Sequence, residues 1–342
     1  FSLGATSSPP YNYPFPNGLQ PGLNSQGGLQ TGFANVIVAD PNLKTMYMEN
    51  WFFGIQKSLG SSMAAEINYI GSQGHHEYAR YNLNRFNGDL LDGTLNLLTP
   101  GFFDIDYGQS NENSHYNGMT ASFRKRTQHG LTFDAAYTWG KAIDQSSKHD
   151  DPEHANAYDD SRERGLADFD IRQRFSFTTL WTVPGPHQGL LNKVFGGWEL
   201  TNVTILQSGS PFSVLCSQSA KLVFDSSGNV VGNTGCDFNL DGTNLDYPNV
   251  PSFGSSKSGL SRSDYLNGIF KASDFPFPAL GTQGSLGRNT YHGPGYANTD
   301  FSIIKNTHSP WFFGGEGANI QFRAEFFNLF NNVNFANPIS NL

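Results

Sequence analysis

Asp237 begins a run of alternating oxygen-bearing side chains that is typical of a calcium loop. Asp237, Asn239 and Asp241 precede Gly242, and in this order short side chains converge on the ion while glycine permits the sharp turn. The bidentate glutamate expected at the twelfth position is replaced by Pro248. The predicted ligands are Asp237, Asn239, Asp241, Thr243 and Asp246. A turn stabilised by Asp and Asn side chains has the same pattern, so both a Ca²⁺ site and a plain turn remain open; no other cofactor is required.

Charged side chains alternate with apolar ones in several other segments. These residues are Glu66, Arg124, Arg126, Asp134, Asp170, Arg172, Arg174, Arg323 and Glu325. On the inner face of a membrane barrel they would line a water-filled lumen, pair with one another and contact a plug domain or an anionic solute. Ion pairs between neighbouring strands would explain them equally well without a ligand. The sequence therefore predicts a lumen charge ladder and leaves its role in solute binding open.

No arrangement of residues indicates an enzyme. The chain lacks a convincing Ser-His-Asp order, a nucleophile elbow or a phosphate-binding glycine loop, and its Gly71–Gly74 and Gly281–Gly284 segments have the composition of turns. Two cysteines, Cys216 and Cys236, lie in one loop-like region. They form either a disulfide, as in an oxidising compartment, or two free thiols.

Apolar residues recur with a period of two, which predicts β-strands. The longest such segment, Asp168–Val183, has Phe175, Phe177 and Trp181 on one face and charged residues on the other. At about 3.3 Å per residue it would extend roughly 50 Å, which is longer than strands of soluble sheets. Further strands are predicted at Tyr47–Ser58, Met63–Tyr69, Tyr116–Thr127, Leu131–Gly140, Trp198–Gln207, Ala297–Asn306 and Asn319–Phe330. In Trp198–Gln207 the apolar residues change faces near Val203, which a β-bulge would explain.

Short and long connections alternate between these strands. The long ones are Gly71–Ser114, Ala142–Ala167 and Gly209–Gly295. In an up-and-down sheet this alternation places every long loop at one end, as in outer-membrane barrels with short periplasmic turns. The sequence therefore predicts an all-β fold: an antiparallel up-and-down transmembrane β-barrel fragment of about eight strands in sequential order. A β-sandwich with irregular loops is the alternative.

Composition narrows the classes of protein. A net charge of −8 argues against a nucleic-acid partner. The mean hydropathy of −0.43, without an apolar run of 18 or more residues, excludes a membrane protein built from helices. Alternating barrel strands escape this test because their two faces average out. The chain starts at Phe1 without a signal peptide, so we expect a fragment whose export is specified upstream.

The segment from Ser161 to Phe175 resembles the signature of Oar-like TonB-dependent outer-membrane transporters. It reads Ser161-Arg162-Glu163-Arg164-Gly165-Leu166-Ala167-Asp168-Phe169-Asp170-Ile171-Arg172-Gln173-Arg174-Phe175, with Gln at position 173 where that family usually has His. Other stretches are similar in the same order, namely Asp40–Thr45, Asn68–Ser72, Tyr137–Lys141, Gly196–Trp198, Gln207–Phe212 and Phe322–Asn331. The resemblance covers essentially the whole chain and implies the C-terminal part of the barrel.

The resemblance also implies a domain organisation and partners. Residues 1–44 would form an outer loop, 45–330 the strands and their connections, and 331–342 an unfinished outer loop. The plug domain, the energy-coupling box and the final strand are expected outside this chain. The protein would lie in the cell outer membrane, contact its lipid, and take part in TonB-dependent uptake of a solute such as an oligosaccharide, peptide or metal chelate. The alternative is a soluble calcium-dependent β-sandwich that recognises carbohydrate or a surface ligand.

Overall fold

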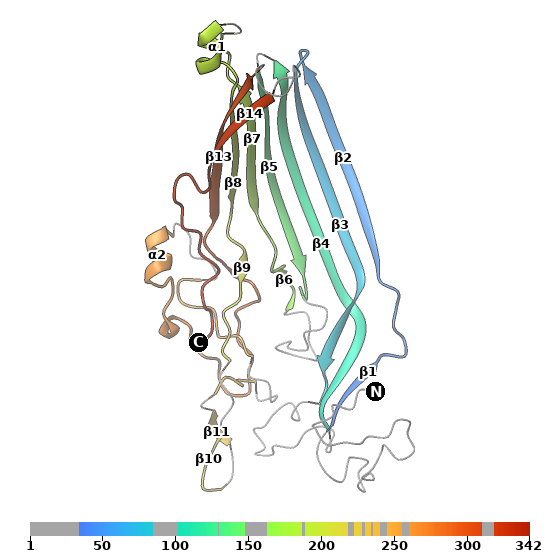
Figure 1. Ribbon diagram of the computed structural model, residues 1–342. Helices are drawn as coiled ribbons and strands as arrows, with labels where there is room; N and C mark the ends of the chain where they lie inside the picture. Colours follow the sequence, from blue (N-terminus) through green and yellow to red (C-terminus); the bar gives the residue numbers. More distant parts are fainter. Residues whose placement is uncertain are drawn as a thin grey trace, which may run out of the picture.

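One long antiparallel sheet dominates the protein (Figure 1). The computed structural model describes residues 34–84, 102–128, 130–147, 163–186, 189–217, 222–227, 230–233, 235–239, 245–254, 260–309 and 318–342. In this part of the chain, no helix has the length and apolarity needed to cross a membrane.

The main path of the sheet contains eight strands in the order of the sequence. They are β2 (Tyr47–Leu59), β3 (Met63–Asn82), β4 (Phe102–Gln128), β5 (Leu131–Asp144), β7 (Gln173–Thr182), β8 (Trp198–Gln207), β13 (Tyr296–Ser309) and β14 (Ala318–Phe326). Each pairs antiparallel with the next. This confirms the predicted up-and-down topology. Within the described residues β2 and β14 are the two edges of this path, so the sheet is not closed.

With exceptions such as Phe52 and Ile70, which lie on the other face, the pairing register places most of the large apolar side chains on one face. For example, Ile55 lies opposite Ile67, and Tyr137 opposite Phe175. We call this the apolar face; its members are Trp51, Phe53, Ile55, Ile67, Tyr69, Met119, Phe123, Phe133, Tyr137, Trp139, Phe175, Phe177, Trp181, Phe301, Phe322 and Phe326. Phe53 is 63% exposed and Phe322 62% exposed. A β-sandwich would bury these residues, whereas a barrel presents them to lipid.

The opposite face, the polar face, carries hydroxyl, amide and charged groups. Its members include Gln56, Glu66, Ser122, Arg124, Asp134, Thr138, Arg174, Ser176, Thr178, Asn298, Asp300, Arg323 and Glu325. Adjacent positions of one strand therefore face different surroundings, as the period of two predicts.

β8 keeps a regular register with both neighbours, so the predicted bulge near Val203 is wrong. Val203 consequently lies on the polar face and Thr204 on the apolar face. The hydroxyl of Thr204 is 3.1 Å from that of Thr299 on β13, and this hydrogen bond satisfies both groups. The hydrogen bond between the two threonines thus allows polar side chains on the apolar face without a β-bulge.

The hairpin formed by β3 and β4 is longer than the sequence predicts. Gly71–Ser114 was expected to be a loop, but β3 continues to Asn82 and β4 begins at Phe102. This extension lies at the long-loop end of the sheet (Figure 1). It lacks the alternation of polar and apolar residues because neither of its faces has to match hydrocarbon. Periodicity alone therefore placed the end of β3 too early and the start of β4 too late.

The strand expected at Asp168–Val183 is shorter in the structure. β7 covers only Gln173–Thr182, and Asp168 and Phe169 form a turn. Asp170 is buried and its carboxylate accepts a hydrogen bond from the backbone N–H of Ala142, at 2.7 Å. Because the Asp170 side chain binds the backbone near the end of β5, the chain turns before β7. The alternation of residue types before Gln173 therefore does not correspond to a strand.

Tight connections occupy the other end of the sheet. β2 and β3 are joined through Gly60 at φ 74°, and β4 and β5 through Gly130 at φ 76°, in the left-handed region that favours glycine. The expected turn between β7 and β8 contains a short helix, α1 (Gly189–Phe195), on which Leu191, Val194 and Phe195 are exposed.

The expected loop between Gly209 and Gly295 contains an ordered substructure, which we call the loop subdomain. Its elements are β9 (Pro211–Phe212), β10 (Leu222–Phe224), β11 (Val230–Asn233), α2 (Arg262–Asn267), the 3₁₀-helix η3 (Ala272–Asp274) and β12 (Tyr291–His292). Its hydrophobic core consists of Phe212, Val214, Tyr247, Ile269, Phe275, Leu286 and Tyr291. The buried apolar residues are thus concentrated outside the main sheet.

Both segments expected as outer loops at the chain ends contain ordered contacts. Residues 1–33 lie outside the described part, but β1 (Ala34–Ala39) pairs parallel with β4. Near the other end, the backbone N–H of Leu342 donates to the carbonyl of Leu215 at 2.9 Å. A two-residue strand, β6 (Gly165–Leu166), also pairs with the end of β5.

Because neighbouring positions face lipid and water in turn, the same substitution should change the stability of the protein by very different amounts at the two positions. In the full-length protein folded into lipid vesicles, we expect Phe177→Arg to lower the free energy of unfolding by about 2–4 kcal/mol, because it exposes a charge to hydrocarbon. Ser176→Arg, on the polar face, should change it by less than about 1 kcal/mol. Denaturant titration measures both values. Equal losses would contradict this assignment of the faces.

Candidate functional site

The polar face brings together most of the predicted charge ladder. Arg124 on β4 and Asp134 on β5 form an ion pair with an Nε–Oδ2 distance of 2.8 Å, and Arg323 contacts Glu325 at 3.4 Å. Glu66 accepts a hydrogen bond from Asn68 at 2.6 Å. Arg174 lies opposite Thr138 on the same face. These half-exposed pairs form a hydrated polar surface and contribute at most about 1 kcal/mol each to stability.

Arg126 lies nearest to the tight-turn end of this ladder. It lines a cleft of about 180 Å³ together with Gln56, Ser58 and the turn between β2 and β3. Its backbone N–H donates to the carbonyl of Ser62 at 2.7 Å. The cleft is lined mostly by polar groups and is smaller than the roughly 300–1,000 Å³ usual for ligand sites, so it has room for a side chain rather than a whole solute.

Asp170 and Arg172 depart from the predicted ladder because both precede β7. Arg172 approaches the buried Asp170 carboxylate with an Nη2–Oδ2 distance of 3.4 Å, and it lies near His292 of β12. Burial, and then the charge of Arg172, lower the pKa of His292, while Asp170 partly offsets them. These residues form a junction between the sheet and the loop subdomain instead of lining the middle of the sheet.

Arg288 anchors the loop subdomain to the end of β5. Its guanidinium pairs with Asp144, approaches Asp168 at 3.4 Å, and donates from Nε to the carbonyl of Glu163 at 2.8 Å. The side chains of Arg288 and Asp144 are only 11% and 7% exposed. A buried ion pair of this kind fixes one arrangement of two segments that are 144 residues apart in the sequence.

Tyr247 extends this anchor into the subdomain core. Its hydroxyl donates to the Glu163 carboxylate at 3.3 Å. Burial, and then the charge of Glu163, raise the pKa of Tyr247, so the hydroxyl stays protonated and keeps donating. The sequence did not reveal this cluster. An arginine between the apolar Leu286 and Tyr291 was the only signal, and it does not specify its partners.

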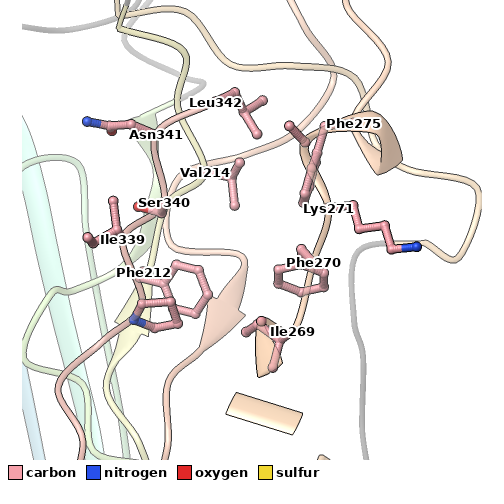
Figure 2. Close-up of a pocket in the computed structure, with 13 residues that line it drawn as sticks. Phe212, Val214, Ile269, Phe270, Lys271, Phe275, Ile339, Ser340, Asn341 and Leu342 are labelled. Carbon is pink, nitrogen blue, oxygen red and sulfur yellow. The ribbon is translucent and has the colours of Figure 1, made fainter. Parts of the chain in front are cut away.

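A small apolar cavity separates the subdomain core from the end of the chain (Figure 2). Its volume is about 140 Å³, and Phe212, Ile269, Phe270 and Leu342 are among its lining residues. Lys271 directs its amino group away from the other side chains (Figure 2). Ligand sites usually enclose about 300–1,000 Å³, so this cavity has room for one side-chain-sized group rather than a whole solute.

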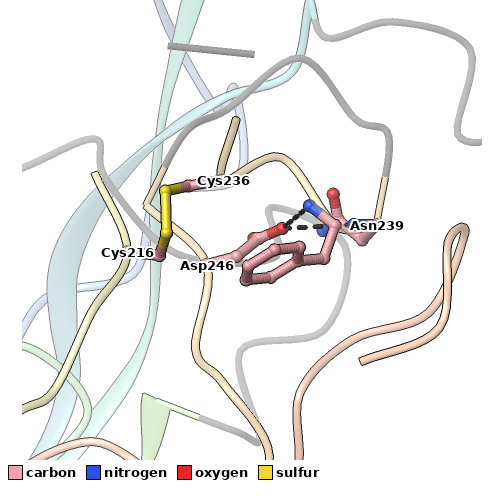
Figure 3. Close-up of a disulfide and its surroundings, with 5 residues drawn as sticks. Cys216, Cys236, Asn239 and Asp246 are labelled. Carbon is pink, nitrogen blue, oxygen red and sulfur yellow. Dashed lines mark hydrogen bonds between the residues drawn. A yellow bond between two sulfur atoms is a disulfide. The ribbon is translucent and has the colours of Figure 1, made fainter. Parts of the chain in front are cut away.

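The predicted calcium loop lies beside a disulfide (Figure 3). Cys216 and Cys236 are bonded, with their Cα atoms 5.2 Å apart. The Oδ2 atom of Asp246 accepts the backbone N–H groups of Phe238 at 2.5 Å and Asn239 at 3.1 Å. Asp246 therefore stabilises the turn directly through its carboxylate.

The remaining predicted ligands are only partly described. Asp237 and Asn239 are buried, whereas Asp241 and Thr243 lie outside the described residues. Within the described part, no group of three or more His, Cys, Asp or Glu side chains is arranged to hold a metal ion. Calcium binding at this loop stays a prediction.

The comparisons with known proteins agree with the two-faced sheet. Residues 2–342 match the family described as Outer membrane beta barrel domain. The chain belongs to this family. It therefore lies in the cell outer membrane, and its apolar face contacts membrane lipid. No curated protein gives a significant match.

Similar solved structures belong to longer chains. They include the outer membrane transporter YddB from Escherichia coli, with 10% identity, a TM-score of 0.43, and 88% of this chain and 31% of that chain covered. The FrpB iron transporter from Neisseria meningitidis has 12% identity, a TM-score of 0.40, and coverage of 90% and 30%. FpvA from P. aeruginosa, bound to heterologous pyoverdines, has 11% identity, a TM-score of 0.34, and coverage of 83% and 28%. The family member described here thus spans less than a third of each.

The Arg288 anchor predicts a local loss of stability when its charge is removed. We expect Arg288→Leu in the full-length protein to destabilise the attachment of the loop subdomain by about 3–5 kcal/mol, because Asp144 would stay buried without its cation. Hydrogen exchange of residues 286–292 measures this loss. Arg323→Leu, which breaks an exposed pair, should cost no more than about 1 kcal/mol. Unchanged exchange in Arg288→Leu would contradict an anchoring role.

The Asp246 turn predicts an effect that does not need calcium. We expect Asp246→Ala to accelerate amide exchange at Phe238 and Asn239, because both N–H groups lose a buried acceptor worth about 1–3 kcal/mol. A calcium chelator should leave the exchange of the unmodified protein unchanged. If chelation alone accelerated it, the carboxylate would be holding the turn through a bound ion.

Proposed function

We propose that this chain is part of the barrel of an Oar-like TonB-dependent transporter, in its C-terminal half. The observation that carries the proposal is the combination of a lipid-facing apolar surface, a hydrated polar surface and a loop subdomain with its own core at the long-loop end of the sheet. This combination suits a barrel whose long loops contact a solute outside the cell. The motifs that resemble those transporters support the same assignment.

The polar face is proposed to line the lumen. Its partnered charges, such as Arg124 with Asp134, keep the wall hydrated without leaving a strong field of one sign. Arg126 and the cleft beside it would face a plug domain at the tight-turn end. In this proposal the plug and a TonB-type energy-coupling protein act through parts of the protein outside this chain.

The loop subdomain is proposed to take part in solute capture. It has its own core, a disulfide and the buried Arg288 anchor, so it can present a fixed surface at the long-loop end. Its cavity is too small for a whole solute, and the contact surface would be the exterior of the subdomain. The solute is proposed to be an oligosaccharide, a peptide or a metal chelate.

Energised uptake tests this proposal. Cells that produce the full-length protein should accumulate one labelled solute class, among oligosaccharides, peptides and metal chelates, in a saturable manner. Deletion of the TonB-type partner should abolish uptake while leaving surface binding intact. Replacement of residues 213–289 by a short Gly-Ser linker should abolish surface binding but allow membrane insertion. Non-saturable uptake that persists without the energy-coupling partner would indicate a passive pore and contradict the proposal.

A further inference from the structure

The apolar face ends in an aromatic row at the long-loop end. The register aligns Phe53, Tyr69, Met119 and Trp139 across four strands. Trp51 lies one row further along, and its ring fills the space that a side chain at Gly71 would need. Aromatic rows of this kind mark the boundary between hydrocarbon and lipid headgroups.

Basic side chains follow directly beyond this row. Lys141 is two residues after Trp139 on β5, so it lies on the same face, opposite Asn117 of β4. Asn117 accepts a hydrogen bond from the hydroxyl of Tyr69 at 2.6 Å, which ties this position to the aromatic row. His115 lies on the same face one row further out, opposite Ile143.

Arg164 reaches the same place from the β5–β7 connection. Leu166 of β6 lies opposite Ile143 on this face, and Arg164 directly precedes this two-residue strand, so its backbone lies beside the end of β5. The electrostatics of His115 agree with that position. Burial, and then the charges of Arg164 and Lys141, lower the pKa of His115, which places both cations near its ring and keeps it neutral.

The two cations have no counterion among the described residues. Neither Lys141 nor Arg164 forms a side-chain ion pair or hydrogen bond with any of them, and both are exposed. On the same face, Glu49 lies in the row of His115, but Gln73 separates them and the carboxylate of Glu49 is directed towards His75, at 4.0 Å. Among the residues that the structure describes, nothing therefore compensates this positive charge at headgroup depth.

We propose that Lys141 and Arg164, with His115 between them, bind the phosphate of an anionic lipid headgroup in the leaflet at the long-loop end. A lipid is the occupant because the cluster lies on the face that contacts lipid, adjacent to Trp139. A soluble anion on its way through the barrel would instead meet the polar face. Each cation near an anionic membrane surface contributes about 1 kcal/mol. This inference depends on the position of the chain in the outer membrane, and not on transport.

Quenching of Trp139 by brominated lipid tests the proposal at the site itself. The full-length protein, with Trp139 as its only tryptophan, is reconstituted into equimolar vesicles of phosphatidylcholine and phosphatidylglycerol, with the bromine on one lipid and then on the other. We expect a preference for phosphatidylglycerol around Trp139 of up to about 30-fold, as two cations worth about 1 kcal/mol each would give. Lys141→Gln with Arg164→Gln should reduce the preference to nearly equal quenching.

Matched variants separate local binding from general charge. Lys57→Gln with Lys125→Gln removes two cations from the same face towards the tight-turn end, and should leave the preference around Trp139 unchanged. Lys141→Arg with Arg164→Lys should preserve it. Equal quenching by both lipids in the unmodified protein would overturn the proposal, as would an effect of the Lys57 and Lys125 pair as large as that of Lys141 and Arg164.

A soluble anion is the remaining alternative. Added inorganic phosphate should not change the preference for phosphatidylglycerol if a lipid headgroup, held at the surface, occupies the site. If inorganic phosphate at millimolar concentration abolished the preference, the cluster would be a site for free phosphate and the lipid assignment would be wrong.

Discussion

The structure depends on one requirement: every backbone N–H and C=O group in the hydrocarbon of the membrane must form a hydrogen bond within the protein. Lipid cannot satisfy N–H and C=O groups, so each strand must be paired along its whole membrane-spanning length. Strands β2 to β14 meet this demand through one continuous antiparallel register. That register also fixes the two faces, because a shift by one residue would direct Arg124 and Asp134 into lipid and Phe123 and Phe133 onto the polar face. At β2 and β14 the same demand calls for partner strands beyond the described sheet.

Outside the membrane the demand is relaxed, and the chain behaves differently. β3 and β4 continue as a hairpin with polar residues on both faces, and the loop subdomain buries its own core of aromatic and aliphatic residues. Water can satisfy exposed backbone groups there, so short strands, helices and irregular segments are all tolerated. The protein thus combines a sheet exposed on both faces with a conventional hydrophobic core at one end.

Buried charges connect these two parts. Arg288 with Asp144, and Asp170 with the backbone of Ala142, hold the loop subdomain and the start of β7 against the end of β5. Such contacts add little net stability relative to apolar packing, but they allow few alternative arrangements because an uncompensated buried charge is costly. These contacts hold the loop subdomain in the fixed orientation that the proposed capture of a solute would require.

The sequence by itself determined the strands that lie in the membrane, their faces and their order. Tyr47–Ser58 was predicted almost to the residue, because hydrocarbon on one side and water on the other impose a period of two. The bounds of Trp198–Gln207 were also predicted, but not its faces, because Val203 and Thr204 break the alternation there. Only the tertiary structure decided where β3, β4 and β7 end, that Arg288 reaches Asp144, and that Lys141 lies near Arg164. Those features depend on contacts between distant segments, and a local pattern of residue types contains no information about which distant segment will be its neighbour.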